Sequence, residues 1–104
     1  MYRNLSVLLY GEPVGELLQT DEGYTFSYRP DYQGHPLSLS LPVTGKPDFS
    51  VRLHPFFKGL APEGWLRRRY SELQRIDEED LLGMLVENGN DLLGAVTLRL
   101  NNHV

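Results

Sequence analysis

Residues 5–28 read LSVLLYGEPVGELLQTDEGYTFSY, with two turn signals between apolar runs. The first signal, GEP at 11–13, divides residues 5–20 into two β-compatible runs and predicts a hairpin. The second signal, DEG at 21–23, ends that hairpin. Residues 24–28 then alternate aromatic and small polar side chains, which is typical of a strand with one buried face. The N-terminal part of the chain therefore predicts three strands joined by short turns.

Two further segments have strand periodicity. Residues 37–41 read LSLSL and predict a fourth strand, with three leucines on one face and two serines on the other. Pro42 ends this run because proline has no N–H to donate to a ladder, and residues 43–50 are predicted to form a loop. Residues 93–100 return to the period of a strand near the end of the chain.

Between these segments the apolar period becomes helical. Pro62 is favourable at the first position of a helix, because its fixed φ angle suits that position. Leu66, Tyr70 and Leu73 then fall on one side of the helical wheel and are predicted to form its buried stripe.

A second helix is predicted directly after the first. Asp77 is the expected N-cap, with Asp80 at the third helical position and Ile76 packed onto Leu81. Gly89 is the expected C-terminal stop.

The order of these elements predicts an α+β domain. We expect an antiparallel sheet of about five strands, either open or barrel-like, with two to three helices packed on it. A length of 104 residues fits a single domain over residues 1–104.

Composition excludes several classes of protein. Ten Lys and Arg against fourteen Asp and Glu give a net charge of −4, which disfavours direct binding of nucleic acid by the free chain. The absence of cysteine excludes disulfides and thiolate-bound metals. No apolar run approaches the ~18 residues of a membrane span. The expected location is the cytoplasm, with no membrane partner.

Motifs for catalysis are not found. His35, His54 and His103 lack metal-binding spacing, and no serine lies in a nucleophile elbow. His54 and Glu63 would form an acid–base pair only if folding brought them together. We therefore expect no catalytic residue, no metal and no cofactor.

The most distinctive segment is FFKGLAPEGW at residues 56–65. On the helical wheel Trp65 lies off the apolar stripe, beside Arg68 and Arg69. Tryptophan and arginine are enriched at the energetic centres of protein interfaces. The candidate partner-binding residues are Phe56, Phe57, Glu63, Gly64, Trp65, Arg67, Arg68 and Arg69.

Other interpretations of this segment stay open. Trp65 can instead fold back over the edge of the sheet, and Gly64 can loosen the first helical turn rather than admit a partner's backbone. The three consecutive arginines at 67–69 are also compatible with a solvated helix face.

Four motifs carry a family resemblance. In chain order they are Pro13-Val14-Gly15, the LSLSLP run at 37–42, Phe56-Phe57-x-Gly-Leu-x-Pro-Glu-Gly64, and Asn90-Asp91-Leu92-Leu93-Gly94-Ala95-Val96. Together they resemble the N-terminal subdomain of HipA-type serine/threonine kinases, the toxins of bacterial toxin–antitoxin systems. The resemblance extends from about residue 5 to about residue 100.

This resemblance implies a binding function. In the family the ATP-binding and catalytic residues lie in the larger portion after this subdomain, so none is carried over. The chain also resembles HipS-type antitoxins of tripartite HipBST systems, which implies that it binds a HipT-type serine/threonine kinase in trans and inhibits it. The expected contact is the segment 56–69, at or near the kinase active site. The resemblance further implies a HipB-type helix-turn-helix protein in a ternary complex.

Two alternatives remain at this point. The chain can be the N-terminal part of a full-length HipA-type kinase, with a scaffold role, or a co-repressor that acts with the HipB-type protein. The polar tail at residues 101–104 is typical of a natural terminus and favours the free-standing antitoxin.

Overall fold

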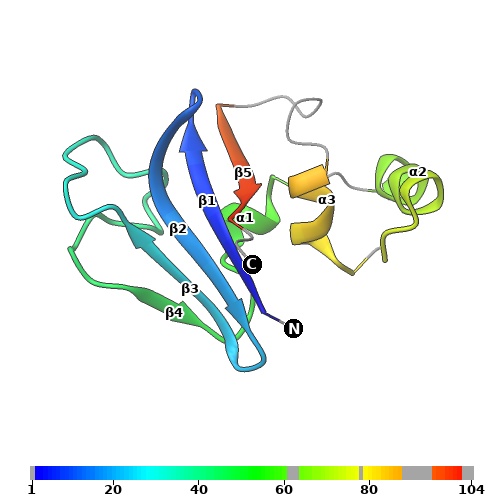
Figure 1. The fold of residues 1–104 in the computed structure, drawn as a ribbon, viewed down its shortest axis with the longest axis horizontal. Helices are drawn as coiled ribbons and strands as arrows, with labels where there is room; N and C mark the ends of the chain where they lie inside the picture. Colours follow the sequence, from blue (N-terminus) through cyan, green and yellow to red (C-terminus); the bar gives the residue numbers. More distant parts are fainter. Residues whose placement is uncertain (1, 61–63, 78, 88–94, 102–104) are drawn as a thin grey trace.

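Five strands and three helices make up the described part of the chain, which comprises residues 2–60, 64–77, 79–87 and 95–101 of a computed structural model. All neighbouring strands are antiparallel, in the order β4-β3-β2-β1-β5 (Figure 1). The elements are β1 (Arg3–Leu9), β2 (Glu12–Thr20), β3 (Gly23–Tyr28), β4 (Asp48–Ser50), α1 (Pro55–Lys58), α2 (Gly64–Gln74), α3 (Leu81–Glu87) and β5 (Val96–Leu100).

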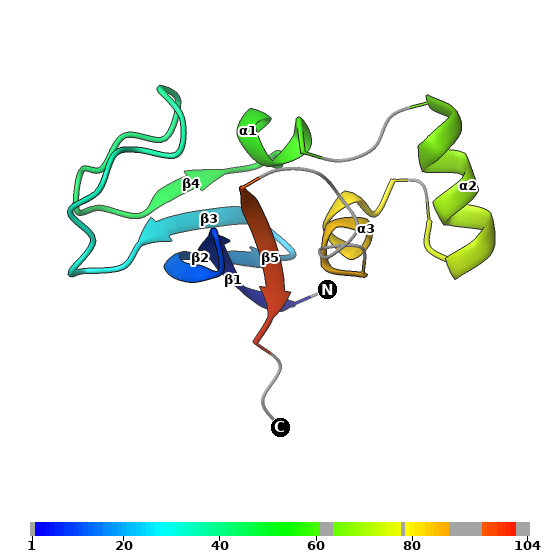
Figure 2. The same cartoon turned by 90° about the horizontal axis from the view of Figure 1, so that it is seen from above.

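The predicted α+β class is confirmed, and the barrel-like alternative is wrong. In the described structure the outer strands β4 and β5 lie at opposite edges of the sheet and do not pair with each other. β4 contains only three residues, so it pairs with only a short part of β3 at its edge of the sheet. Helix α3 lies beside β5 at the other edge, which protects that strand from further pairing (Figures 1 and 2).

The hairpin predicted over residues 5–20 is confirmed as β1 and β2. Its turn has positive φ angles of 50° at Tyr10 and 83° at Gly11. Two consecutive residues with positive φ angles are typical of a two-residue hairpin turn, whose twist matches the right-handed twist of the paired strands. The register shifts between Val7 and Leu8, which pair with Gly15 and Pro13, so Val14 is an extra residue in β2.

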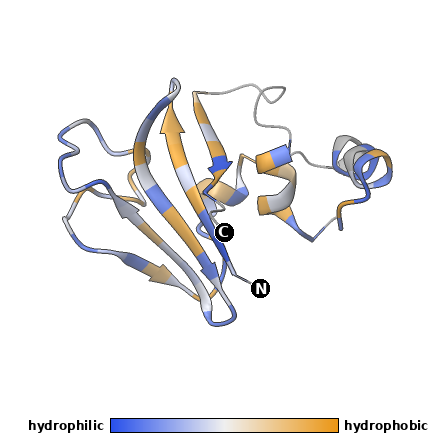
Figure 3. Cartoon of the chain, viewed as in Figure 1, coloured by the Kyte–Doolittle hydropathy of each residue, from blue (hydrophilic) through white to orange (hydrophobic). Residues whose placement is uncertain are grey.

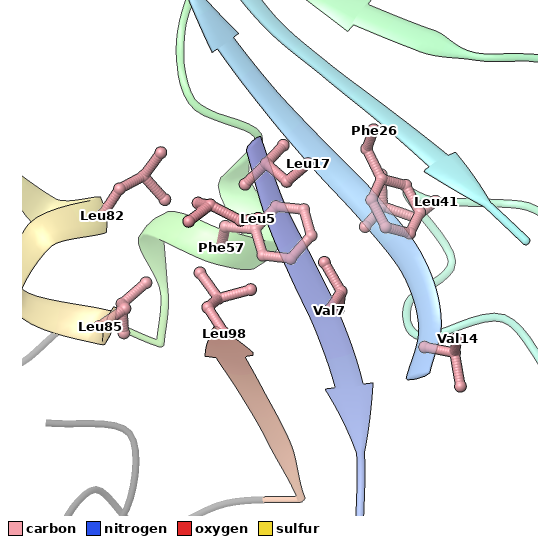
Figure 4. Close-up of a cluster of buried hydrophobic side chains, with 10 residues drawn as sticks. All are labelled: Leu5, Val7, Val14, Leu17, Phe26, Leu41, Phe57, Leu82, Leu85 and Leu98. Carbon is pink, nitrogen blue, oxygen red and sulfur yellow. The ribbon is translucent and has the colours of Figure 1, made fainter. Parts of the chain in front are cut away.

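The core lies between the sheet, α1 and α3 (Figure 4). Leu82 and Leu85 of α3 and Phe57 of α1 point toward the side chains of the central strands (Figure 4). Apolar residues are concentrated along β1 and α3, whereas α2 is largely hydrophilic (Figure 3). The buried cluster consists of Leu5, Val7, Val14, Leu17, Phe26, Leu41, Phe57, Leu82, Leu85 and Leu98.

The predicted strand at 37–41 is wrong. Leu41 is buried, but Leu39 is 97% exposed, and the backbone N–H of Leu41 donates to the carbonyl of Ser38 at 3.0 Å. The Tyr28 hydroxyl accepts a hydrogen bond from the N–H of Leu37 at 2.8 Å and donates one to the carbonyl of Leu41 at 2.5 Å. A side chain thus satisfies backbone groups that a strand would have paired, and the segment folds as a turn.

The fourth strand lies instead at β4, inside the stretch predicted to be a loop. Among the described strands it pairs with β3 alone, where Phe26 opposes Asp48 and Tyr24 opposes Ser50. Three residues are too few for a periodicity to be recognised in the sequence.

Helix α2 confirms the predicted first helix, and its predicted start at Pro62 lies outside the described residues. The predicted buried stripe is wrong at Leu73, which is 66% exposed. Helix α2 lies at the end of the molecule, beyond α3 and away from the sheet (Figures 1 and 2). It therefore has no sheet face against which Leu73 can pack. The side chains of Leu66 and Tyr70 lie outside the described residues.

Helix α3 confirms the second predicted helix but begins later than expected. Asp80, not Asp77, caps it, because its Oδ1 accepts from the N–H of Gly83 at 3.2 Å. Ile76 consequently lies four residues before the cap rather than directly before the predicted one, and its packing onto Leu81 stays a prediction. The predicted stop at Gly89 lies outside the described residues.

Candidate functional site

Helix α1 is held to the core by one aromatic side chain. Phe57 is fully buried, with its ring centroid 5.4 Å from that of Phe26 and 5.2 Å from that of Phe56. Pro55 occupies the first turn of this short helix. Phe57 therefore positions the segment, and its predicted place on a partner-binding surface is wrong because a buried side chain reaches no partner.

Phe56 lies at the boundary of the core. Its ring meets that of Phe57 edge to face, with an interplanar angle of 76°. It is only partly buried, so part of its apolar surface faces outward. Phe56 remains a candidate contact, supported from behind by Phe57.

Helix α2 carries the basic residues of the candidate site. Arg68 and Arg69 are exposed and Arg67 is partly buried. Leu73, one turn further along, adds an exposed apolar side chain to the same helix. Exposed arginines together with unburied apolar surface are typical of a protein interface.

Three candidate positions fall in the incompletely described start of this segment. Glu63, the burial of Gly64 and the side chain of Trp65 lie outside the described residues. The backbone of residues 64 and 65 forms the beginning of α2. An outward-facing Trp65 therefore stays a prediction.

A cleft of about 560 Å³ lies beside α1. Arg52 and Lys58 bring positive charge to it, and Glu79 and Asp80 bring negative charge. Its other lining residues are Gln19, Tyr24, Ser50, Leu53, Pro55, Leu81 and Leu82. Sequence reasoning missed this cleft because its lining comes from separate strands and helices, with no local motif to mark it.

Asp80 in this cleft joins α3 to the sheet. Its two carboxylate oxygens accept hydrogen bonds from the guanidinium of Arg3 at 2.7 and 2.8 Å. This bidentate pairing lowers the pKa of the Asp80 carboxyl below its ordinary value of 3.8, and burial opposes the shift. The same pair raises the pKa of Arg3.

His54 has a structural environment. It is buried, and its Nε2 lies 2.9 Å from the backbone carbonyl of Asp48, so the ring ties α1 to β4. Its Nδ1 has no hydrogen-bond partner among the described residues. The pairing of His54 with Glu63 falls outside the described part of the chain. His35 is exposed, and no group of residues that could hold a metal is found in the described ranges.

Comparisons with known proteins agree on one family. The family model described as HipA N-terminal domain matches residues 5–99. The solved structure of an N-terminal domain of HipA toxin has a TM-score of 0.80 and 43% identity, covering 100% of this chain and 97% of that chain.

Two curated relatives differ in length. An uncharacterized protein of Haemophilus influenzae is 48% identical over 99 residues, covering 95% of this chain and 93% of that protein. Putative kinase Y4dM of Sinorhizobium fredii is 34% identical over 105 residues, covering 90% of this chain but only 26% of the kinase.

The chain belongs to the HipA N-terminal domain family. The matched region is this small N-terminal domain of HipA, which does not include the kinase domain. Its family connects it with toxin–antitoxin systems. None of the helices in the described ranges is long and apolar enough to cross a membrane.

Proposed function

We propose that this protein is an antitoxin that binds a HipT-type serine/threonine kinase in trans and inhibits it. The contact is made by the segment from Phe56 to Arg69, docked at or near the kinase active site. The observation that carries the proposal is the position of α2, which lies away from the sheet with Arg68, Arg69 and Leu73 exposed (Figure 2).

The charge of the segment supports a kinase as partner. A kinase active site holds carboxylates that bind metal ions and phosphates. The exposed arginines Arg68 and Arg69 pair favourably with such groups, and bidentate arginine–carboxylate pairs are among the strongest polar contacts. The net charge of −4 of the whole chain conceals this local positive helix.

Apolar surface supplies the remaining affinity in this proposal. Trp65 and Phe56 flank the α1–α2 connection, and large aromatic side chains dominate the energetics of interfaces. Fully buried Phe57 fixes the base of the segment, which lowers the conformational entropy lost on binding.

A kinase assay with purified components tests the proposal. The wild-type chain should bind a HipT-type kinase and abolish its phosphorylation activity. Trp65→Ala should weaken binding by about 2–4 kcal/mol, and Arg68→Ala with Arg69→Ala should weaken it further. Arg99→Ala on β5 is the matched control, because it removes an exposed arginine outside the segment.

Two results would contradict the proposal. A kinase that stays active with saturating wild-type protein excludes inhibition. A folded Trp65→Ala variant that protects cells from the co-expressed kinase as fully as the wild type excludes the proposed anchor.

A scaffold role is the second candidate, since the chain aligns with 26% of a putative kinase. In that arrangement the same domain would support the kinase within one polypeptide. Addition of the separate domain to a kinase that already contains its own copy would then leave the activity unchanged.

A further inference from the structure

Helix α2 receives little support from the rest of the domain. It lies beyond α3 at the end of the molecule, away from the sheet (Figures 1 and 2). Among the side chains that the structure describes in this helix, none is buried. Two of them, Arg67 and Ser71, are partly buried. The exposed ones are Arg68, Arg69, Glu72, Leu73 and Gln74.

Helix α3 shows the contrast. It has only seven residues, yet it buries Leu82, Met84 and Leu85. Leu82 and Leu85 point toward the central strands (Figure 4). A short helix in a protein takes most of its stability from packing of this kind. Helix α3 is therefore held by the core, whereas the described side chains of α2 supply no such anchor.

The local sequence of α2 does not compensate for the missing packing. The helix has 11 residues, and helices shorter than about 12–15 residues are marginal without tertiary support. Arg68 and Glu72 are four residues apart, but the glutamate follows the arginine, which is the less favourable order. Arg75, directly after the helix, has a φ of 56° at a position that normally takes glycine.

The other end of the docking segment is firmly held. Phe57 of α1 is fully buried, and the N–H of Gly59 donates to the carbonyl of Pro55 at 2.9 Å. The segment from Phe56 to Arg69 thus begins on a fixed element and ends on a weakly supported one.

We infer that α2 is only partly helical in the free protein and becomes fully helical when it docks on the kinase. This inference rests on the proposed function and describes how its binding site is regulated. The helix in the structure is then the binding-competent state of the segment. Binding supplies the free energy that orders it, so the apparent affinity falls in proportion to the fraction of free protein in which α2 is disordered.

Hydrogen exchange on the free protein tests the first half of the inference. The amides of residues 67–74 should exchange at least about tenfold faster than the paired amides of β1 and β2, because the helix opens without unfolding the sheet. Equal protection of α2 and these strands would overturn the inference.

Paired substitutions measure the coupling to the kinase. Ser71→Gly and Ser71→Ala both remove the hydroxyl of a residue outside the docking segment, and they differ in helix propensity. The glycine variant should bind the purified HipT-type kinase about threefold to fivefold more weakly than the alanine variant. Glu72→Gly and Glu72→Ala should give a similar ratio at an exposed position.

The matched control is the same exchange at Glu87, an exposed glutamate of α3. Glu87→Gly and Glu87→Ala should bind with equal affinity, because α3 is folded in the free protein and in the complex alike. A ratio at Glu87 as large as that at Ser71 would contradict the inference, since the affinity would then follow the stability of the whole domain.

The outcomes separate this inference from the proposed function. If the wild-type chain binds the kinase and the glycine and alanine variants at residues 71 and 72 bind equally well, α2 is already ordered in the free protein. The inference is then wrong and the proposed function stands. If the wild-type chain does not bind the kinase, the proposed function is wrong, and the coupling with it.

Discussion

At the scale of single residues, Gly15 shows how closely β2 and β3 pack. A Cβ atom at this position would lie 2.5 Å from the carbonyl oxygen of Ser27 and 3.0 Å from the ring of Phe26. Real Cβ atoms do not approach a backbone oxygen so closely, so any side chain forces the strands apart. The requirement is one of space, since Gly15 does not have a positive φ angle.

Gly15→Ala should therefore lower the free energy of unfolding by about 1–3 kcal/mol, the usual cost of overpacking a core. Urea denaturation measures the change. Gly59→Ala is the control, because its Cβ would lie 3.4 Å from the nearest atom, the carbonyl oxygen of Pro55. An equal loss for both variants would show that crowding is not the cause.

At the scale of elements, the end of α2 has an unusual residue. Arg75 has a φ of 56°, and the N–H of Ile76 donates to the carbonyl of Ser71 at 3.2 Å. This is the Schellman pattern, in which glycine normally takes the left-handed position. An L-residue with a Cβ is strained there by about 1–2 kcal/mol.

Arg75→Gly should raise the melting temperature by relieving this strain, with a gain of up to about 1 kcal/mol after the added flexibility of the unfolded chain is subtracted. Arg75→Ala keeps the Cβ and should give no gain. If alanine and glycine stabilise the protein equally, the arginine charge and not the backbone is responsible.

The link between β1 and α3 depends on the charge of Asp80. Its pKa is lowered in the folded state by Arg3, so its contribution to stability is complete above the ordinary value of 3.8. That contribution is lost as the pH falls through the lower, folded-state pKa. Acidification below 3.8 should therefore weaken the link, and α3 should be released from the sheet only as the pH passes the lower, folded-state pKa of Asp80.

Asp80→Asn retains a side chain able to cap α3 but removes the ion pair. It should cost about 1–2 kcal/mol at pH 7 and flatten the fall in stability between pH 4 and pH 2. Denaturation curves over this range measure the effect. The assigned link is wrong if the variant and the wild type lose stability in parallel.

At the scale of the whole molecule, charge is unevenly distributed. The chain is net acidic, yet α2 carries three consecutive arginines. A local patch of this kind accelerates association with an acidic surface and is screened by salt. The proposed complex should therefore form more slowly as the salt concentration rises, as measured by stopped-flow mixing with the kinase. Replacing Arg68 and Arg69 by alanine should remove most of this dependence, and an unchanged salt dependence would place the contact elsewhere.

Local patterns in the sequence were sufficient for the hairpin, for β3 and β5, and for the existence of α2 and α3. Each of these elements is specified by turn residues and by an apolar periodicity that involve only positions close together in the sequence. The same local patterns wrongly predicted a strand at residues 37–41. There the hydroxyl of Tyr28, distant in the sequence, hydrogen-bonds to the backbone of Leu37 and Leu41. The local patterns failed also at Leu73, because a helical wheel does not reveal whether a second surface is present to cover it.

Some features of the candidate site could likewise be predicted from the sequence, whereas others depend on the tertiary structure. The aromatic and basic composition of residues 56–69 and the family membership are properties of the sequence itself, since motif order and residue type do not depend on packing. Tertiary structure alone placed Phe57 in the core, left Leu39 in solvent, and formed the cleft at Asp80. Burial depends on contacts between segments far apart in the chain, and these contacts exist only when the sheet and helices are assembled.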